Sequence, residues 1–338
     1  MAKANTNPTR TMMSLLSGAW VAQAIFVAAR LGIADLLCAG PQTAAALAAT
    51  TSTHAPSLYR VMRALASIGI FTEEPDGSFA LTTLADLLRS DAPGSLRAYA
   101  IMNGERWVWR SWGEIEFSVR TGQPAFEHVF GLPLFDYYAS NPESGSVSAA
   151  ALSSLSVAEN SAIVAAREFP LTGTVVDVGG GEGSLLASIL TAHPGIDGVL
   201  FERPAVIEAA RLRLAAAGLA DRCRLVSGDF FTVVPPAGDL YLMKKVIHDW
   251  DDEEAQTILA RCRAAMPASA RLLLAEQMIL DDAQRSATKW LDLLMLVYTG
   301  GKERTEQQYR ALLSSAGFVV ERVLSTNTNI SIIEARPL

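Results

Sequence analysis

A glycine-rich turn in the middle of the chain has the form of a ligand-binding loop. Residues 175–184 read VVDVGGGEGS, in which an apolar run of strand length leads into Gly179 and Gly181 and then into an expected helix. Glycines at this point let the backbone approach a ligand closely and leave the helix N–H groups free to hold it. Glu202 ends the next apolar run, where a carboxylate can accept both hydroxyls of a ribose. These residues predict a site for an adenosine-bearing cofactor.

The residues around the turn distinguish between cofactors. The glycines follow GxGxG, whereas the dinucleotide pattern GxGxxG needs a glycine where Ser184 stands. Asp177 would repel a pyrophosphate but suits an amino group. The next expected strand is followed by Asp229 and Phe230, an acid for an adenine amine and a ring to pack on its face. Three acidic positions at successive strand ends favour a cationic sulfonium cofactor over a dinucleotide.

Apolar runs and helical repeats predict the elements that hold these motifs. Strands are expected over residues 174–178, 198–201, 223–226, 240–243 and 271–275, with a terminal pair over 318–324 and 329–335. Helices are expected near 184–192, 204–217, 252–265 and 305–316. Strands that alternate with helices are typical of an open, mostly parallel sheet. The predicted fold class is therefore α/β, with a Rossmann-like domain over residues 166–338.

Residues 1–100 have a different pattern. Short helices are expected over 44–49, 57–68 and 84–88, and two apolar runs around an Asp-Gly turn predict a hairpin within 70–81. Three helices and a hairpin outline a winged helix, a shape that many DNA-binding proteins share. The helix that would read DNA offers only Arg60 and Arg63 as cations, and the chain has 28 basic against 35 acidic residues. We therefore expect no nucleic-acid partner.

The segment between Arg10 and Arg30 contains no charge, and Ala22-Gln23-Ala24 loosely resembles a signal-peptidase site. Its apolar residues repeat at the spacing of a helix–helix seam: Leu15, Ala19, Ala22, Phe26, Ala29 and Ile33. This favours a subunit-interface helix over an export signal. Elsewhere we expect no apolar run of about 18 residues, and hence no membrane span.

Cysteines and histidines show no pattern for a disulfide framework or a metal site. The three cysteines are scattered, and the four histidines lack HxxxH and HExxH spacing. We expect no bound metal, a reducing compartment and a cytoplasmic protein.

Several motifs, in order along the chain, resemble those of S-adenosylmethionine-dependent O-methyltransferases of the plant caffeate and bacterial polyketide or phenazine type. They are DVGGG (177–181), ERP (202–204), GDF (228–230), KKVIHDW (244–250) and GGKERT (300–305), and the resemblance covers nearly the whole chain. It implies cofactor contacts at Gly179, Glu202, Asp229, Phe230 and Lys244. It also implies a homodimer in which the N-terminal helices interlock and help close the partner's pocket. Plant members usually have aspartate where Glu202 stands, and the longer carboxylate should still reach the ribose.

The same resemblance implies that His248 is the general base and that Glu276 and Glu303 flank its imidazole. The chemistry agrees, since a phenol titrates near ~10 and a neutral histidine with a pKa near ~6.5 is a suitable acceptor for its proton. A carboxylate beside the imidazole fixes its tautomer and stabilises the imidazolium that forms. The alternative is that His248 is a loop residue, while Asp249 or Asp251 caps the helix expected from residue 252.

An aromatic-rich stretch over residues 105–140 suggests a pocket for a flat, apolar ligand, although core packing explains most of its rings. Residues 101–165 are expected to form a helical linker region that contributes to this pocket. The candidate substrate contacts are Asp249, Met102, Trp107, Phe126, Leu294, Met295 and Tyr298.

The predicted function is O-methylation of a hydroxyl on an aromatic small molecule, such as a hydroxyphenazine or an aromatic polyketide. Two enzyme alternatives stay open, a nitrogen-methylating relative and a relative with altered chemistry. A winged-helix regulator that senses a ligand through a retained cofactor fold is the non-enzyme alternative. The net acidic charge argues against it.

Overall fold

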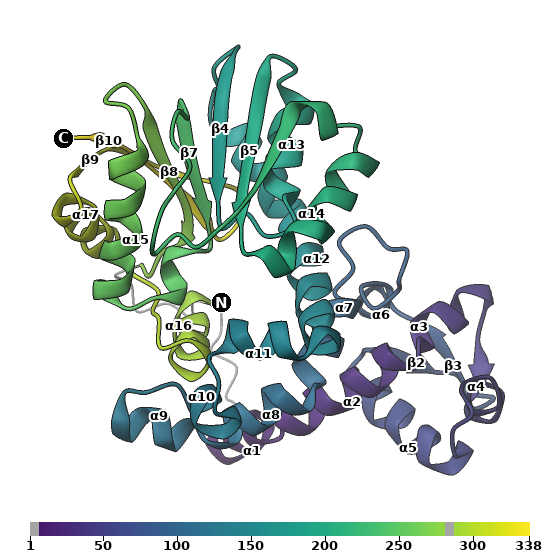
Figure 1. Cartoon of the computed structure of the whole chain (residues 1–338). Coiled ribbons are helices and arrows are strands. Elements are labelled where there is room, and N and C mark those ends of the chain that lie inside the picture. The colour runs from purple at the N-terminus through teal and green to yellow at the C-terminus, as the bar shows by residue number, and fades with distance from the viewer. Residues whose placement is uncertain (1–6, 281–286) are drawn as a thin grey trace. The chain divides into compact units, whose positions relative to one another are not determined.

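The computed structural model describes residues 7–280 and 287–338, and the chain divides into two compact units (Figure 1). The N-terminal unit comprises residues up to 109 together with 141–155, and the sheet unit comprises 110–140 and 156–338. The stretch 101–165, expected as one linker region, is thus shared between the two units. Residues 110–140 join the sheet unit because their aromatic helix packs on a helix from its C-terminal half, where Phe126 meets Tyr298 edge to face.

The N-terminal unit contains the expected helices and hairpin. Its elements are α1 (Pro8–Leu16), α2 (Gly18–Arg30), α3 (Ile33–Leu36), η1 (Leu37–Ala39), β1 (Gln42–Thr43), α4 (Ala44–Thr51), α5 (Ala55–Ala66), β2 (Phe71–Glu73), β3 (Ser78–Leu81), α6 (Thr83–Asp86) and α7 (Arg97–Gly104). Strand β1 adds a third, unexpected strand beside β3. Leu47, Met62 and Phe79 are fully buried at its centre.

The apolar stretch 10–30 forms two helices rather than one. They meet at a bend of 43° at Ser17, and serine–glycine pairs are common places for a helix to kink. The side chains of α1 and the start of α2 leave a large apolar surface exposed. Its members are Met12, Met13, Leu15, Leu16 and Trp20, whose exposed fractions run from 57% to 75%.

Between α7 and the first strand of the large sheet the chain forms five helices: α8 (Arg106–Gly113), α9 (Ile115–Thr121), α10 (Ala125–Phe130), α11 (Leu134–Ser140) and α12 (Pro142–Ala166). By length and composition α12 could cross a membrane, and so could α1 and α2 taken together. Helix α12 meets this criterion because its many alanines raise the mean hydropathy, although serines, Glu159 and Asn160 interrupt any continuous apolar run. Its Glu159 and Asn160 bind Lys244 of the sheet and Ile163 is fully buried, so this end of α12 packs as a core helix.

The sheet unit has seven strands in the order β6-β5-β4-β7-β8-β10-β9. These are β4 (Gly173–Val178), β5 (Ile196–Glu202), β6 (Cys223–Ser227), β7 (Leu240–Lys244), β8 (Arg271–Gln277), β9 (Phe318–Ser325) and β10 (Ile330–Pro337). All pairs are parallel except those of β10, which runs antiparallel to β8 and β9. Each expected strand is present, with ends that differ by no more than two residues.

Helices cover both faces of this sheet, as Figure 1 shows. The helices and helical turns that follow β4 in the chain are α13 (Ser184–Ala192), α14 (Pro204–Ala216), η2 (Ala220–Arg222), η3 (Ile247–Asp249), α15 (Asp252–Ala265), α16 (Ala287–Tyr298) and α17 (Glu306–Ser315). One face packs on α15 and α17 through residues such as Leu259 and Leu313, and the other on α13 and α14 through Leu186 and Leu214. The α/β fold class predicted from the sequence is confirmed.

Arg222 joins the end of α13 to the sheet. Its guanidinium donates to the carbonyl oxygens of Leu190 (2.6 Å), His193 (3.3 Å), Pro194 (2.9 Å) and Ile196 (3.1 Å). We expect Arg222→Ala to lower the free energy of unfolding by about 2 kcal/mol, because charged hydrogen bonds to these carbonyls are lost. Arg224→Ala, at an exposed position on β6, should change it by less than about 0.5 kcal/mol. Urea unfolding of both variants checks this, and equal losses would contradict it.

Candidate functional site

The glycine-rich turn follows β4, the strand between β5 and β7. Gly179, Gly181 and Gly183 have φ angles of 70°, 59° and 77°, which side chains disfavour. A Cβ on Gly180 would lie 2.4 Å from the Leu200 side chain and 2.5 Å from a carboxylate oxygen of Asp177. The glycines are thus needed both for the turn itself and for its close approach to the sheet.

Glu202 is fastened to this turn. One of its carboxylate oxygens accepts the N–H of Gly181 at 2.9 Å, and the other accepts the N–H of Arg203 at 2.7 Å. Each oxygen keeps a second lone pair for a further donor. The side chain is half-buried, so the carboxylate is held in one orientation at the place where the sequence predicts ribose binding.

Asp177 lies beneath the turn and is 1% exposed. Neither of its carboxylate oxygens has a hydrogen-bond partner among the residues that the structure describes. Burial, reinforced by the negative charge of Glu202 and opposed by Lys244, raises the pKa of Asp177 to about 7. A cationic neighbour would stabilise the charged form of this buried carboxyl group, and the cofactor's amino group is such a neighbour. The assignment of Asp177 to that amino group stays a prediction.

Asp229 and Phe230 follow β6 at the same edge of the sheet. Asp229 is exposed, and one of its oxygens accepts the N–H of Phe231 at 2.9 Å, which fixes the local turn. A Cβ on Gly179 would lie 3.5 Å from the Phe230 ring, so this ring borders the glycine turn. Phe230 also meets Trp250 edge to face, with ring centroids 5.9 Å apart. The placement fits an adenine seat beside the turn.

Lys244 ends β7 in a polar cluster that sequence reasoning missed. Its Nζ lies 2.8 Å from Asn160 Oδ1 and 2.9 Å from a carboxylate oxygen of Glu159, both on α12. Asn160 also donates to Ser184 Oγ at 3.1 Å, at the start of α13, and Glu159 also binds Lys245. Burial lowers the pKa of Lys244, an effect that Glu159 partly offsets. The sequence feature that could have revealed this cluster is the adjacent polar pair Glu159 and Asn160 inside an alanine-rich helix.

His248 lies in the turn η3, after the neighbouring strand end. Its Nδ1 is 2.7 Å from Glu303 Oε1 and 3.9 Å from Glu276 Oε2, and its Nε2 is 3.8 Å from Asp249 Oδ1. His248, Glu276 and Glu303 are all buried. The second oxygen of Glu276 accepts the backbone N–H groups of Val246 and Ile247. The structure therefore brings together the histidine and both glutamates, as the sequence resemblance implied.

The protonation of this group differs from expectation. Burial disfavours the imidazolium, but Asp249, Glu276 and Glu303 outweigh it and raise the pKa of His248 to about 10. Burial also raises the pKa of Glu276 to about 7 and that of Asp249 to about 6, although His248 opposes both shifts. The three carboxylates around His248 therefore favour its protonated form more than the sequence led us to expect.

The remaining candidates lie in different surroundings. Phe126 and Tyr298 are buried, and their ring centroids are 6.2 Å apart. Met295 is also buried, and Leu294 on the same helix is half-buried. Met102 and Trp107 are buried in the N-terminal unit. A role for these six side chains in acceptor binding stays a prediction.

The first turn of α15 settles which aspartate caps it. Asp251 Oδ1 accepts the N–H of Glu254 at 2.9 Å, so Asp251 and not Asp249 is the N-cap. Asp249 is left beside the imidazole, where the sequence predicts a substrate contact.

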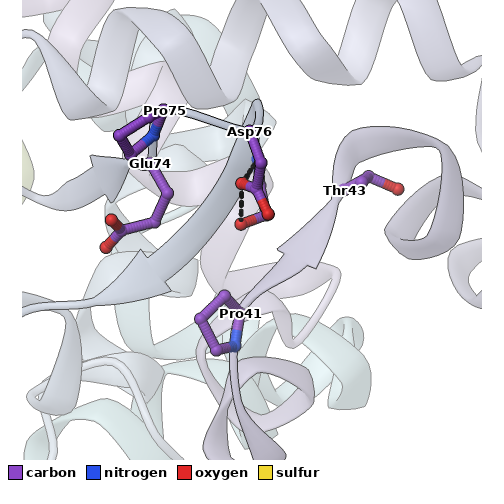
Figure 2. Close-up of a pocket in the computed structure, with 6 residues that line it drawn as sticks. Pro41, Thr43, Glu74, Pro75 and Asp76 are labelled. Atoms are coloured by element: carbon purple, nitrogen blue, oxygen red, sulfur yellow. Dashed lines mark hydrogen bonds between the residues drawn. The ribbon is translucent and has the colours of Figure 1, made fainter.

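A surface pocket on the N-terminal unit holds none of the candidate residues. Figure 2 shows Pro41, Thr43, Glu74, Pro75 and Asp76 around it. Asp76 is already used by its own turn, since one oxygen accepts both the N–H and the hydroxyl of Ser78. Across residues 7–280 and 287–338 there is no group of three or more His, Cys, Asp or Glu side chains arranged to hold a metal ion.

Comparisons with known proteins bear on the whole chain. Residues 112–319 match the model of an O-methyltransferase domain, and residues 13–91 match that of an O-methyltransferase dimerisation domain. A phenazine O-methyltransferase of Lysobacter antibioticus is 45% identical over 327 residues, which cover 97% of this chain and 96% of that protein. A phenazine-1-carboxylate N-methyltransferase of Pseudomonas aeruginosa is 31% identical, with 96% of each covered.

A solved structure agrees with the cofactor prediction. The O-methyltransferase NcsB1 from neocarzinostatin biosynthesis, solved in complex with S-adenosylmethionine and 2-hydroxy-5-methyl naphthoic acid, matches with a TM-score of 0.83 and 34% identity. The match covers 94% of this chain and 96% of that one. The cofactor predicted from the acidic strand ends is therefore the one that this structural neighbour binds.

Gly301 lets the segment of Glu303 approach the histidine turn. A Cβ at Gly301 would lie 2.1 Å from the carbonyl oxygen of His248 and 2.4 Å from the backbone of Asp249. We expect Gly301→Ala to lower the free energy of unfolding by about 1–3 kcal/mol, because backbone must move to relieve the overlap. Gly113→Ala, where no atom lies within 4 Å of the added Cβ, is the control. Denaturant unfolding measures both, and an unaltered Gly301→Ala midpoint would contradict the close approach.

Proposed function

The chain belongs to the family of S-adenosylmethionine-dependent O-methyltransferases, and on that basis we propose that it methylates a hydroxyl of an aromatic small molecule such as a hydroxyphenazine or an aromatic polyketide. The observation that carries this proposal is the 2.7 Å contact between His248 Nδ1 and Glu303, at the same edge of the sheet as the glycine turn. A base and a cofactor loop at neighbouring strand ends are what methyl transfer to a hydroxyl requires.

The residues around the glycine turn fit S-adenosylmethionine. Glu202, locked by two backbone N–H groups, would hold the ribose hydroxyls, and Asp229 and Phe230 would hold the adenine. Backbone groups of Gly179 and Gly181, with Asp177 and Lys244, would hold the amino acid end. The cofactor supplies a methyl group on a positively charged sulfur.

His248 would accept the proton of the acceptor hydroxyl. Since Nδ1 is engaged by Glu303, Nε2 is the nitrogen left to face the acceptor, and Asp249 lies beside it. A pKa near 10 matches that of a phenol, which titrates near ~10, so proton transfer between them costs little free energy. Glu303 and Glu276 stabilise the imidazolium that results.

The dimerisation domain supports a homodimer. We infer that the exposed apolar side chains of α1 and α2, among them Leu15 and Trp20, pack against a second copy of the chain. A cytoplasmic location agrees with three free cysteines, two of them buried.

Replacement of the proposed base is the direct test. We expect His248→Ala to lower turnover of a hydroxylated aromatic by about 10²–10⁴-fold, since general-base catalysis contributes that much. The dissociation constant of S-adenosylmethionine, measured by calorimetry, should stay within about twofold, because the cofactor residues lie around other strand ends. His54→Ala, at an exposed histidine of the N-terminal unit, is the control. An unchanged rate in His248→Ala would remove His248 from the base role.

The same variant distinguishes O-methylation from the alternative, methylation of a nitrogen. The 31% identical N-methyltransferase keeps this alternative open. An amine or ring nitrogen with a free lone pair needs no base. A ring-nitrogen product formed at full rate by His248→Ala would therefore favour N-methylation. Mass spectrometry of the product, with fragmentation to locate the methyl group, makes the distinction.

The pH dependence should follow the histidine. Because the neutral imidazole is the active form and its pKa is raised to about 10, kcat/KM should increase as pH rises above 7. Glu303→Gln removes a negative charge that raises the pKa of His248. In this variant the increase of kcat/KM should therefore occur at lower pH. Glu306→Gln, at an exposed position on α17, should leave the profile in place. Identical profiles for wild type and Glu303→Gln would contradict the assignment.

A further inference from the structure

Arg304 is a fully buried arginine directly after Glu303. A buried guanidinium is stable only when its donors are paired. Nε and Nη2 both donate to Asp252 Oδ1, at 3.1 and 2.9 Å. Nη1 donates to the carbonyl oxygen of Ile247 at 3.1 Å, and Nη2 also donates to that of Trp250 at 2.9 Å.

These partners bracket the proposed base. Ile247 precedes His248, and Trp250 follows the turn η3 that ends at Asp249. Nη1 of Arg304 also donates to the carbonyl oxygen of Lys302 at 3.3 Å, on its own segment. One planar group therefore ties both ends of the histidine turn to the segment that carries Glu303.

Two backbone contacts extend this connection. The N–H of Lys302 donates to the carbonyl oxygen of His248 at 2.9 Å. The N–H of Glu303 donates to Asp292 Oδ1 on α16 at 2.9 Å. Glu303 is thus fixed between α16 and the histidine turn, and Arg304 supplies the side-chain part of that link.

Resting on the proposed function of His248, we propose that Arg304 is a positioning residue for the base, which sets the distance between the imidazole and the Glu303 carboxylate. Lysine cannot replace it, because a single ammonium cannot present the planar fork of donors that reaches Asp252 and two carbonyl groups together. Without that fork the histidine turn is held less tightly and the contact lengthens.

A longer contact changes how His248 titrates. The acidic groups that face the imidazole are Asp249 on its own turn, Glu276 on β8 and Glu303. Three further groups interact electrostatically with these acids or with one another. Asp292 interacts with Glu303 and Arg304, and Tyr309 interacts with Glu276, Glu303 and Arg304. Since the carboxylates hold the pKa of His248 up, loosening the Glu303 contact lowers it.

The experiment compares Arg304→Lys with wild type by NMR titration of imidazoles labelled with carbon-13. The His248 signal is assigned by its loss in His248→Ala. We expect the pKa of His248 to fall by about 1 unit in Arg304→Lys, the scale of a displaced charge. We expect kcat to fall about 10²-fold, as a misplaced catalytic group would give, with a smaller change in the acceptor KM. Arg310→Lys, at an exposed arginine of α17, should change neither.

A structural role alone gives a different result. A lower melting temperature and lower kcat with the His248 pKa unchanged would overturn the inference, and so would an unchanged pKa with unchanged kcat. If Arg304→Lys does not fold, Asp252→Asn decides, because Asp252 is 61% exposed in its side chain and its loss releases one arm of the guanidinium. In Asp252→Asn, a fall in the pKa of His248 that is smaller than the roughly 1 unit expected for Arg304→Lys supports the inference. An unchanged pKa of His248 overturns it. A shifted pKa with full turnover in both Arg304→Lys and His248→Ala would uphold positioning but refute the base role.

Discussion

The enclosure of one imidazole by three carboxylates, those of the buried Glu276 and Glu303 and of the half-buried Asp249, is the constraint on which the site depends. Taken singly, each of these charges would be costly to remove from water. Together they are compensated by the imidazole of His248, whose pKa they raise, by the backbone N–H groups that reach Glu276, and by the tight contact of Glu303 with Nδ1. The register of β7 and β8 makes this possible. Lys244 pairs with Ala275, so the residues that follow Lys244 pass directly beside Glu276.

The places of the proposed cofactor residues follow from the order of the strands. Starting from β4, the chain adds β5 and β6 on one side and β7 and β8 on the other. The glycine turn leaves the sheet at the point where this direction changes, which is where open α/β sheets bind ligands. Glu202 ends the strand on one side of the turn and Lys244 ends the strand on the other. The proposed base, His248, follows Lys244 by only four residues, so the proposed cofactor and acceptor residues share one edge of the sheet.

Much of this could be predicted from the sequence, and the exceptions have physical reasons. The strands are short apolar runs that do not need tertiary context, and His248 and Glu303 lie within motifs of fixed order, while Glu276 lies near the end of an expected strand. The raised pKa of His248 could not be predicted, because it depends on distances among residues that are far apart in the chain. Glu159 could not be found from a pattern either, since it acts through Lys244. Asp249 was named as a substrate contact, but the sequence also left it free to cap a helix. The break at Ser17 was hidden by apolar residues on both sides of it.

Strand β10 lies between β8 and β9 although it follows both in the chain. During synthesis, the leucine-rich strand β8 therefore keeps one edge without a partner until β10 has been made. Such an edge invites pairing with other chains and exposes the folding protein to aggregation. Glu276 belongs to β8 and is paired there with Ser331 of β10. The strand that carries Glu276 is consequently covered on both edges only when the sheet closes, so a chain that stalls before this step is the most prone to aggregate.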